Sequence, residues 1–283
     1  MNNTSDEGGI LFGVDNVLYE IYLQNTIFYG NSASDSLISI ENTVNIYFIN
    51  TTFIMSKNLL FSASSSKLKI LSSVINDVEC SNFIPACLAL VNDNSSLVIQ
   101  NTLINNVNHL RAEGGIQSTN SYIMISNASL RNMKTSKQIG SCFSGSDLKL
   151  DIISIVVQDY DANCIFLEKS SLFLNNSYFN NIEQNPDSNF DNKYGTIRCK
   201  DCISLVLSFT LFEHNDYVEN GGALTLSSLN FVVQNLINSC IFQSIKAKNK
   251  GGVLLIDYTN LQIYNSSFFG NEASEGGAIF YQG

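Results

Sequence analysis

The stretch Gly276-Gly277-Ala278-Ile279 is the clearest copy of a short phrase, a glycine pair followed by an apolar strand, that recurs along the chain. Other clear copies begin at Gly8, Gly114, Gly221 and Gly251. Weaker copies fill the gaps and give a repeat of roughly 27 residues, about ten of them from end to end. A repeat of this size cannot bury its own apolar face, so it must stack on its neighbours. The period therefore predicts a solenoid.

A second phrase in each repeat alternates apolar residues with other residues and then reaches an asparagine. Ile46 to Phe53 and Leu261 to Phe268 are two copies. This alternation over five or six positions is typical of a half-buried strand. With the strand after the glycine pair and a third strand after the asparagine, each repeat holds three short strands. The sequence predicts an all-β fold, a right-handed single-stranded parallel β-helix of about ten coils, as one domain over residues 1–283.

The recurring asparagine has a physical role at a sharp bend between two strands. Asparagine tolerates the left-handed backbone conformation, and its amide can bond to the equivalent group one coil away. Ser72, Ile152 and Phe209 are expected to interrupt the stack, and the register near residue 235 is open between Asn235 and Asn238. The predicted members of the stack are Asn25, Asn50, Asn101, Asn127, Asn176 and Asn265.

The glycine phrase is paired with copies of Phe-x-x-Asn at Phe28–Asn31, Phe212–Asn215 and Phe268–Asn271. This combination resembles the repeats of the chlamydial polymorphic outer-membrane proteins and, more widely, pectin-lyase-like β-helices. The resemblance covers nearly all of the chain, although only the first, fifth and last three turns carry a true glycine pair. It implies the fold and surface exposure rather than an activity.

Composition excludes several classes of function. The net charge of −10 and the pI of about 4.6 disfavour nucleic acid as a partner, because phosphate binding requires clustered Lys and Arg. The longest apolar stretches, such as residues 151–158, are too short to cross a bilayer, so we expect no transmembrane segment. Residues 1–7 are short and polar and lack the features of a signal peptide.

The two ends of the repeat array carry no recognisable cap, and exposed strand edges invite association. We consider two explanations: the chain is a segment of a longer solenoid, or its ends stack on other copies to form a fibre. In the second case the residues that carry assembly are Gly8, Gly9, Ile10, Leu11, Ala278, Ile279, Phe280 and Tyr281.

The chain has seven cysteines. Cys80 and Cys87 bracket a loop, and Cys199 and Cys202 lie close together at a bend, so both pairs are candidate disulfides. Cys142 and Cys164 occupy equivalent positions in adjacent coils and are expected either to pair or to stack as apolar residues. No second pair or suitable histidine accompanies Cys-x-x-Cys, which disfavours zinc. We expect no metal and no cofactor.

Several asparagines lie in sequons for N-glycosylation. We expect Asn50, Asn127 and Asn265 to be inaccessible in the bend stack. Asn94 lies in a polar turn and Asn175 on the outside of a strand. If the protein is secreted by a eukaryote, Asn94 and Asn175 are the expected acceptors.

Because many β-helices act on polysaccharides, we searched for catalytic groups. Hydrolysis requires paired carboxylates on adjacent coils, and lyase chemistry requires a calcium-binding acidic cluster beside a base. The acids are instead scattered, as Asp159 and Asp161 in a turn and as Glu183, Asp187 and Asp191 in a polar insertion at residues 181–194. We therefore predict no catalytic residue.

The expected function is that of a non-enzymatic extracellular or cell-surface structural protein, a subunit of a head-to-tail β-helical fibre. Its expected partners are copies of itself and glycans. One alternative is a segment of a longer cell-surface adhesin. A second alternative is a carbohydrate-binding or carbohydrate-active β-helix.

Overall fold

The structure is a computed structural model that describes residues 11–14, 19–42, 44–80, 85–109, 114–135, 140–160, 163–182, 194–215, 218–228 and 234–283. Within these ranges every regular element is a β-strand, and every strand pair is parallel. The prediction of an all-β parallel solenoid with a spacing of about 27 residues is confirmed. No helix in the described part of the chain has the length and apolar character needed to cross a membrane.

Three stacks of strands make up the solenoid. The first is a ten-stranded sheet with the strands β2 (Tyr19–Gln24), β5 (Val44–Ile49), β8 (Lys67–Leu71), β11 (Ser96–Gln100), β14 (Tyr122–Ser126), β17 (Lys149–Ile153), β20 (Ser171–Asn175), β23 (Ser204–Ser208), β27 (Gln234–Asn238) and β31 (Gln262–Tyr264). The second, which we call the short-strand stack, contains β3 (Ile27–Tyr29), β6 (Thr52–Ile54), β9 (Val74–Glu79), β12 (Leu103–His109), β15 (Ser129–Thr135), β18 (Val156–Tyr160), β21 (Tyr178–Ile182), β24 (Leu211–Glu213), β28 (Ile241–Gln243) and β32 (Ser267–Phe269).

The third stack, which we call the returning stack, brings the chain back to the ten-stranded sheet. It contains β1 (Leu11–Val14), β4 (Ser32–Glu41), β7 (Lys57–Ser64), β10 (Ala89–Asn92), β13 (Ile116–Thr119), β16 (Phe143–Ser146), β19 (Ile165–Glu168), β22 (Ile197–Lys200), β26 (Leu224–Ser227), β30 (Leu254–Asp257) and β33 (Ile279–Gln282). A further two-stranded pair is formed by β25 (Val218–Asn220) and β29 (Ala247–Lys250).

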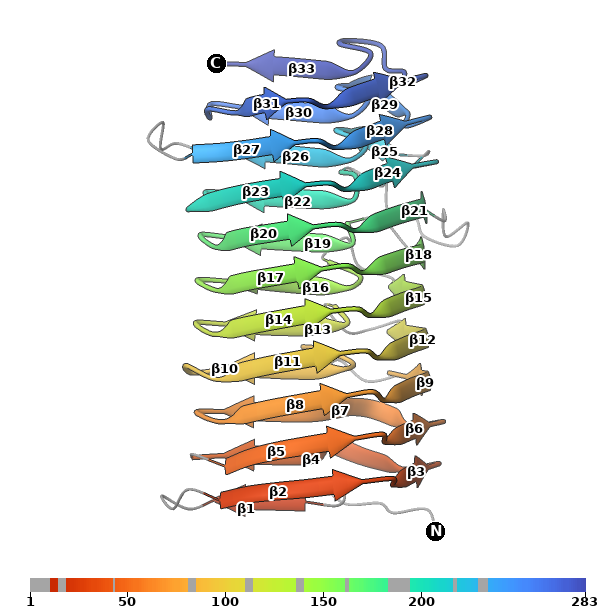
Figure 1. The fold of residues 1–283 in the computed structure, drawn as a ribbon, viewed down its shortest axis with the longest axis vertical. Coiled ribbons are helices and arrows are strands. Elements are labelled where there is room, and N and C mark those ends of the chain that lie inside the picture. Colours follow the sequence, from red (N-terminus) through yellow and green to blue (C-terminus); the bar gives the residue numbers. More distant parts are fainter. Residues whose placement is uncertain are drawn as a thin grey trace.

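Figure 1 shows how the coils follow one another. The strands of the ten-stranded sheet run from left to right at the front, and the returning stack runs from right to left behind them while the chain rises from its N-terminal to its C-terminal end. This path is a right-handed coil. The offset between paired residues of adjacent coils ranges from 22 residues, between Ile46 and Leu68, to 33 residues, between Leu172 and Leu205.

The core is built from files of side chains that repeat once per coil, because parallel strands pair in register. One file runs through the short-strand stack, and all of its members except Phe268 are buried. Rings stack on rings near both ends of this file, with centroids 4.8 Å apart for Phe28 and Phe53 and 5.1 Å apart for Phe179 and Phe212. The file contains Phe28, Phe53, Ile75, Ile104, Leu130, Val157, Phe179, Phe212, Phe242 and Phe268.

The glycine pair serves two purposes at the entrance to the returning stack. The first glycine, as in Gly251 and Gly276, has a φ of +61°, a conformation that other residues adopt at a cost. The second glycine allows close approach of the coils, since a Cβ on Gly252 would collide with the carbonyl oxygen of Gly277. Both requirements recur once per coil, which explains why the phrase shows the period so clearly.

Candidate functional site

The predicted asparagine stack lies at the corner between the ten-stranded sheet and the short-strand stack, which we call the first corner. All six predicted members have left-handed φ values, between 48° for Asn265 and 53° for Asn25. Four other residues complete the corner with φ between 49° and 55°: Ser72, Ser154, Phe209 and Ser239. The expected interruption at Ile152 is wrong, because Ile152 is a fully buried residue of β17. The open choice between Asn235 and Asn238 is resolved by Ser239, which takes the corner.

Few amides bond to one another along the first corner. Asn50 Nδ2 donates to Asn25 Oδ1 at 2.7 Å, and Asn176 Nδ2 donates to the Ser154 hydroxyl at 3.0 Å. Hydroxyls one residue further along the chain supply additional contacts. Ser73 Oγ, for example, donates to the carbonyl of Leu71 at 2.8 Å and accepts from the backbone N–H of Thr51, in the coil below, at 3.1 Å.

A longer side-chain ladder lies at the corner that follows the inward file of the short-strand stack, which we call the second corner. Asn132 Nδ2 donates to Asn106 Oδ1 at 2.6 Å, and Asn106 Nδ2 donates to Asp77 Oδ1 at 2.9 Å. All three residues have left-handed φ values near 54°. Sequence analysis missed this ladder, although the three residues are separated by 29 and 26 residues, close to the period of the fold.

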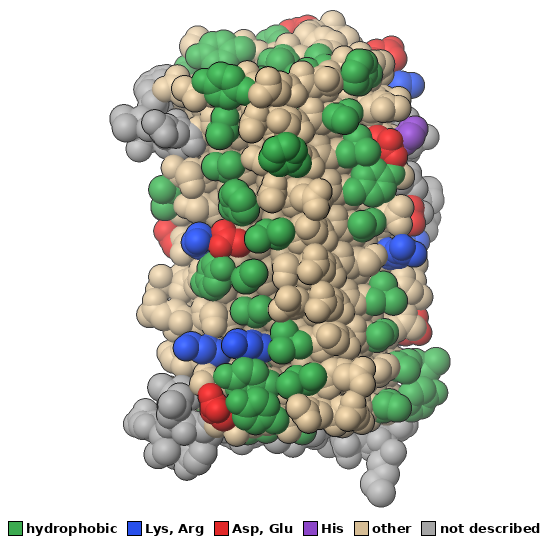
Figure 2. Space-filling view, in the orientation of Figure 1, with side chains coloured by type: hydrophobic (Ala, Val, Ile, Leu, Met, Phe, Trp, Pro, Cys, Tyr) green, Lys and Arg blue, Asp and Glu red, His purple; other side chains and the backbone are tan. Residues whose placement is uncertain are grey.

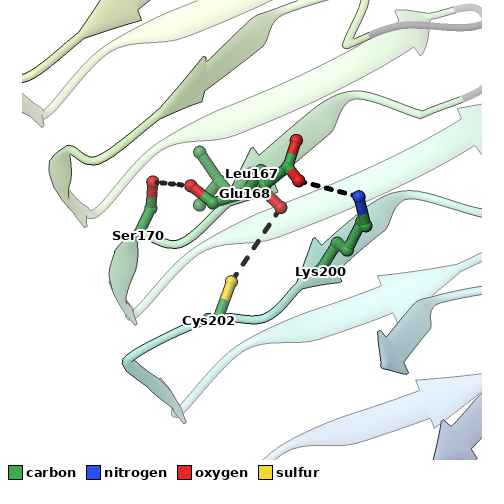
Figure 3. A network of polar contacts seen from close by, with 5 residues as sticks. All are labelled: Leu167, Glu168, Ser170, Lys200 and Cys202. Atoms are coloured by element: carbon green, nitrogen blue, oxygen red, sulfur yellow. Dashed lines mark hydrogen bonds and ion pairs between the residues drawn. The ribbon is translucent and has the colours of Figure 1, made fainter. Parts of the chain in front are cut away.

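The cysteines lie in three settings. Cys80 and Cys87 form a disulfide with Cα atoms 5.8 Å apart, and Cys199 and Cys202 form a second with Cα atoms 5.7 Å apart. Figure 3 shows Cys202 where the chain leaves β22, with its sulfur 4.0 Å from the carbonyl oxygen of Leu167; a disulfide sulfur has no proton to donate, so this is a packing contact. The remaining thiols, Cys142, Cys164 and Cys240, are free and buried.

The same region holds an ion pair on the outer surface. Lys200 Nζ lies 2.7 Å from Glu168 Oε1 on the neighbouring coil, and Ser170 Oγ donates to the Glu168 carbonyl at 2.7 Å (Figure 3). The bond to Glu168 raises the pKa of Lys200. These contacts join coils and define no cavity.

The sequon asparagines differ in their exposure. Asn94 is exposed, whereas Asn175 is half-buried in the outer surface of the ten-stranded sheet. The expectation that the bend would hide Asn50, Asn127 and Asn265 is wrong, because all three are exposed. The left-handed corner points these side chains outward.

The residues predicted to carry assembly are only partly described. Gly8, Gly9 and Ile10 lie outside the described residues, and Leu11 begins β1, where it pairs with Ile38. At the other end, β33 pairs with β30 in the register that places Ile279 beside Leu254. The side chains of Ile279 and Tyr281 in β33 are 39% and 60% exposed.

A buried polar cluster inside the solenoid is the nearest approach to a reactive site. The hydroxyls of Tyr160 and Thr196 are 2.8 Å apart, and Asn215 Nδ2 donates to Thr196 at 2.6 Å. Burial raises the pKa of Tyr160, and burial together with the neighbouring Cys142 raises the pKa of the Cys164 thiol. Raised pKa values keep both groups neutral and poor nucleophiles, so the cluster serves packing.

The acidic residues do not form a described metal site. Asp159 takes a left-handed position at the second corner, while Asp161, Glu183, Asp187 and Asp191 lie outside the described residues. Over the described ranges, no group of three or more His, Cys, Asp or Glu side chains could hold a metal ion.

The outer surface of the ten-stranded sheet is unusually apolar for a solvent-facing surface. Figure 2 shows a column of hydrophobic side chains on this face, broken by a few charged ones. Its most exposed members include Tyr22 at 55% and Phe173 at 37%. Tyr22 stacks on Tyr47 with ring centroids 4.5 Å apart, and Lys69 Nζ lies 5.1 Å from the centre of the Tyr47 ring.

No protein-family model matches the chain, and no curated protein matches it. The likeness to the chlamydial repeats and to pectin-lyase-like β-helices therefore rests on the repeat alone.

Proposed function

We propose that this chain is a non-enzymatic structural rod that acts outside the cell and assembles end to end. The observation that carries the proposal is the edge of β33. This strand continues the returning stack in register with β30, and within the described residues no strand pairs with its other edge. A parallel strand edge of this kind accepts a further strand, either from the same chain or from another copy.

An oxidising environment is supported by the two disulfides. Cys80–Cys87 and Cys199–Cys202 are bonds of a kind that persists in secreted proteins and is rare in the cytosol. Labelling of intact cells with an antibody against the rod tests the location. Labelling that appears only after the cells are made permeable would contradict it.

Electron microscopy of the natively purified protein tests assembly. We expect filaments whose axial repeat equals the length of one rod, because each copy would continue the sheets of the last. Ile279→Pro should abolish the filaments while leaving the rod folded, since proline removes a strand donor. Ile279→Val is the matched control and should leave them intact.

Filaments that survive Ile279→Pro would overturn end-to-end assembly through β33. A natively purified rod much longer than the described coils would instead favour a piece of a longer adhesin-like protein, in which the chain's own continuation covers this edge.

A further inference from the structure

We infer that the outer surface of the ten-stranded sheet is a lateral interface at which two copies of this chain pack face to face with their long axes antiparallel. This inference concerns a different surface from the ends of the rod. It therefore stands or falls separately from end-to-end assembly.

The first step is the central outward file of the sheet, which we call the apolar strip file. Register places one residue of this file on each of the ten strands, and seven of the ten are apolar or aromatic. The three others are Lys69, Asp151 and Gln262. In order, the file reads Tyr22, Tyr47, Lys69, Val98, Met124, Asp151, Phe173, Val206, Leu236 and Gln262.

The second step is that the adjacent outward file widens the strip. Ile49, Leu71, Ile153 and Tyr264 lie beside it, one strand position pair further along, and all four side chains are partly or largely exposed. Isolated apolar side chains on a surface are ordinary, but a contiguous apolar patch along a whole face marks an interaction surface.

The third step is that this face offers side chains and few free backbone groups. Its strands already pair with the coils above and below, so a partner cannot add a strand there. The partner must pack flat against the side chains, as two sheets do in a sandwich at about 10 Å separation.

The fourth step is that a second copy has the right size and shape. Ten strands with a separation of about 4.8 Å, each offering about five residues, give a face of roughly 750 Å². A stable protein interface buries about 800 Å² on each partner. A second copy supplies an equally long and equally apolar face.

The fifth step is that charge selects the antiparallel arrangement. If the two rods ran parallel, Lys69 would face Lys69 and Asp151 would face Asp151, and like charges placed opposite each other are destabilising. If the rods run antiparallel, β8 faces β23 and β11 faces β20, so Lys69 lies opposite Val206 and Val98 opposite Phe173. The aliphatic stem of Lys69 can then cover apolar surface while its ammonium reaches solvent.

Light scattering coupled to size-exclusion chromatography, over a range of concentrations of the whole chain, tests the interface. We expect a concentration-dependent dimer mass. Phe173→Lys should weaken dimerisation by at least about tenfold, because it buries an unpaired charge opposite Val98. Ile27→Lys is the matched control, since Ile27 is 70% exposed on β3, away from this face, and the dimer should persist.

A mass that stays monomeric at all concentrations would overturn the inference. So would a dimer that survives Phe173→Lys, or one that Ile27→Lys weakens equally. Circular dichroism of each variant establishes that the rod is still folded. Ile279→Pro should leave the lateral dimer intact, which separates failure here from failure of end-to-end assembly.

Disulfide trapping tests the orientation. A mixture of Val98→Cys and Phe173→Cys chains should form a crosslinked heterodimer under mild oxidation, because these positions face each other in the antiparallel pair. Crosslinking of Val98→Cys chains mainly to one another would show that the rods run parallel and would overturn the proposed arrangement.

Discussion

From β9 to β18 the short-strand stack has aliphatic side chains inside, whereas from β21 to β32 it has stacked phenylalanine rings. The first section contains Ile75, Ile104, Leu130 and Val157, and its second corner carries the Asn132–Asn106–Asp77 ladder. In the second section the ring centroids of Phe212 and Phe242 are 5.2 Å apart, and the second corner carries His214, Ser244 and Gly270.

The difference teaches that one strand geometry permits two ways of joining coils. In the aliphatic section, directional hydrogen bonds outside the core join neighbouring coils in addition to the packing within it. In the aromatic section, ring stacking inside the core adds to the area that is buried. The consequences of removing a side chain should therefore differ between the sections.

The largest effect is expected for Phe212→Ala. Phe212 is fully buried between Phe179 and Phe242, so its removal leaves a cavity and breaks two ring contacts. We expect the free energy of unfolding to fall by about 4 kcal/mol in urea denaturation. Leu130→Ala in the aliphatic section should cost about 3 kcal/mol. A larger loss for Leu130→Ala than for Phe212→Ala would contradict the proposed contribution of ring stacking.

A smaller effect is expected for Asn106→Ala in the ladder. The change removes the bond to Asp77 and the bond from Asn132, and it places alanine at a φ of 54°. We expect the free energy of unfolding to fall by about 2 kcal/mol. Asn106→Gly tolerates the backbone conformation and loses only the hydrogen bonds, so it should cost about half as much. Equal costs for the two variants would show that the side-chain ladder alone matters.

A pH-dependent effect is expected for Tyr178 in the aromatic section. Burial and a hydrogen bond to Glu213 raise the pKa of Tyr178 to about 12. A raised pKa in the folded state means that the associated stability is fully present below about pH 10 and is lost as the pH rises toward 12. Ultraviolet titration should show this late ionisation, and Glu213→Gln should move the pKa down. An unchanged titration curve in Tyr178→Phe would exclude this assignment.

The smallest effect is expected for the exposed pair Lys200 and Glu168 on the returning stack. Lys200→Ala should lower the free energy of unfolding by at most about 0.5 kcal/mol, since exposed ion pairs contribute little. The loss should vanish in high salt. A loss comparable with that of Asn106→Ala would show that outer-surface charges join coils as strongly as the ladder does.

Much of the fold could be predicted because its requirements recur once per coil. Gly276 needs a left-handed φ and Gly277 lies against the coil below, so the same two residues return at each period. The six corner asparagines were found for the same reason. Ser154 and Ser239 were missed because a serine can take the left-handed conformation without giving a distinctive local pattern.

The candidate interfaces were harder to predict. Alternation identifies which residues of a strand share a side, but it does not show whether that side has a partner. Phe173 and Val206 therefore read as ordinary strand residues in the sequence. Only the register of ten strands shows that they belong to one apolar file.

The sequence by itself determined the period, the parallel solenoid and the first corner, because these depend on local backbone conformation and on alternation repeated along the chain. The tertiary structure decided which corner forms the longer amide ladder and which outward residues gather into one face. Those features depend on the offset between coils, which varies from 22 to 33 residues. Contacts between residues so far apart in the chain are set by the stacking of whole coils, which no single repeat specifies.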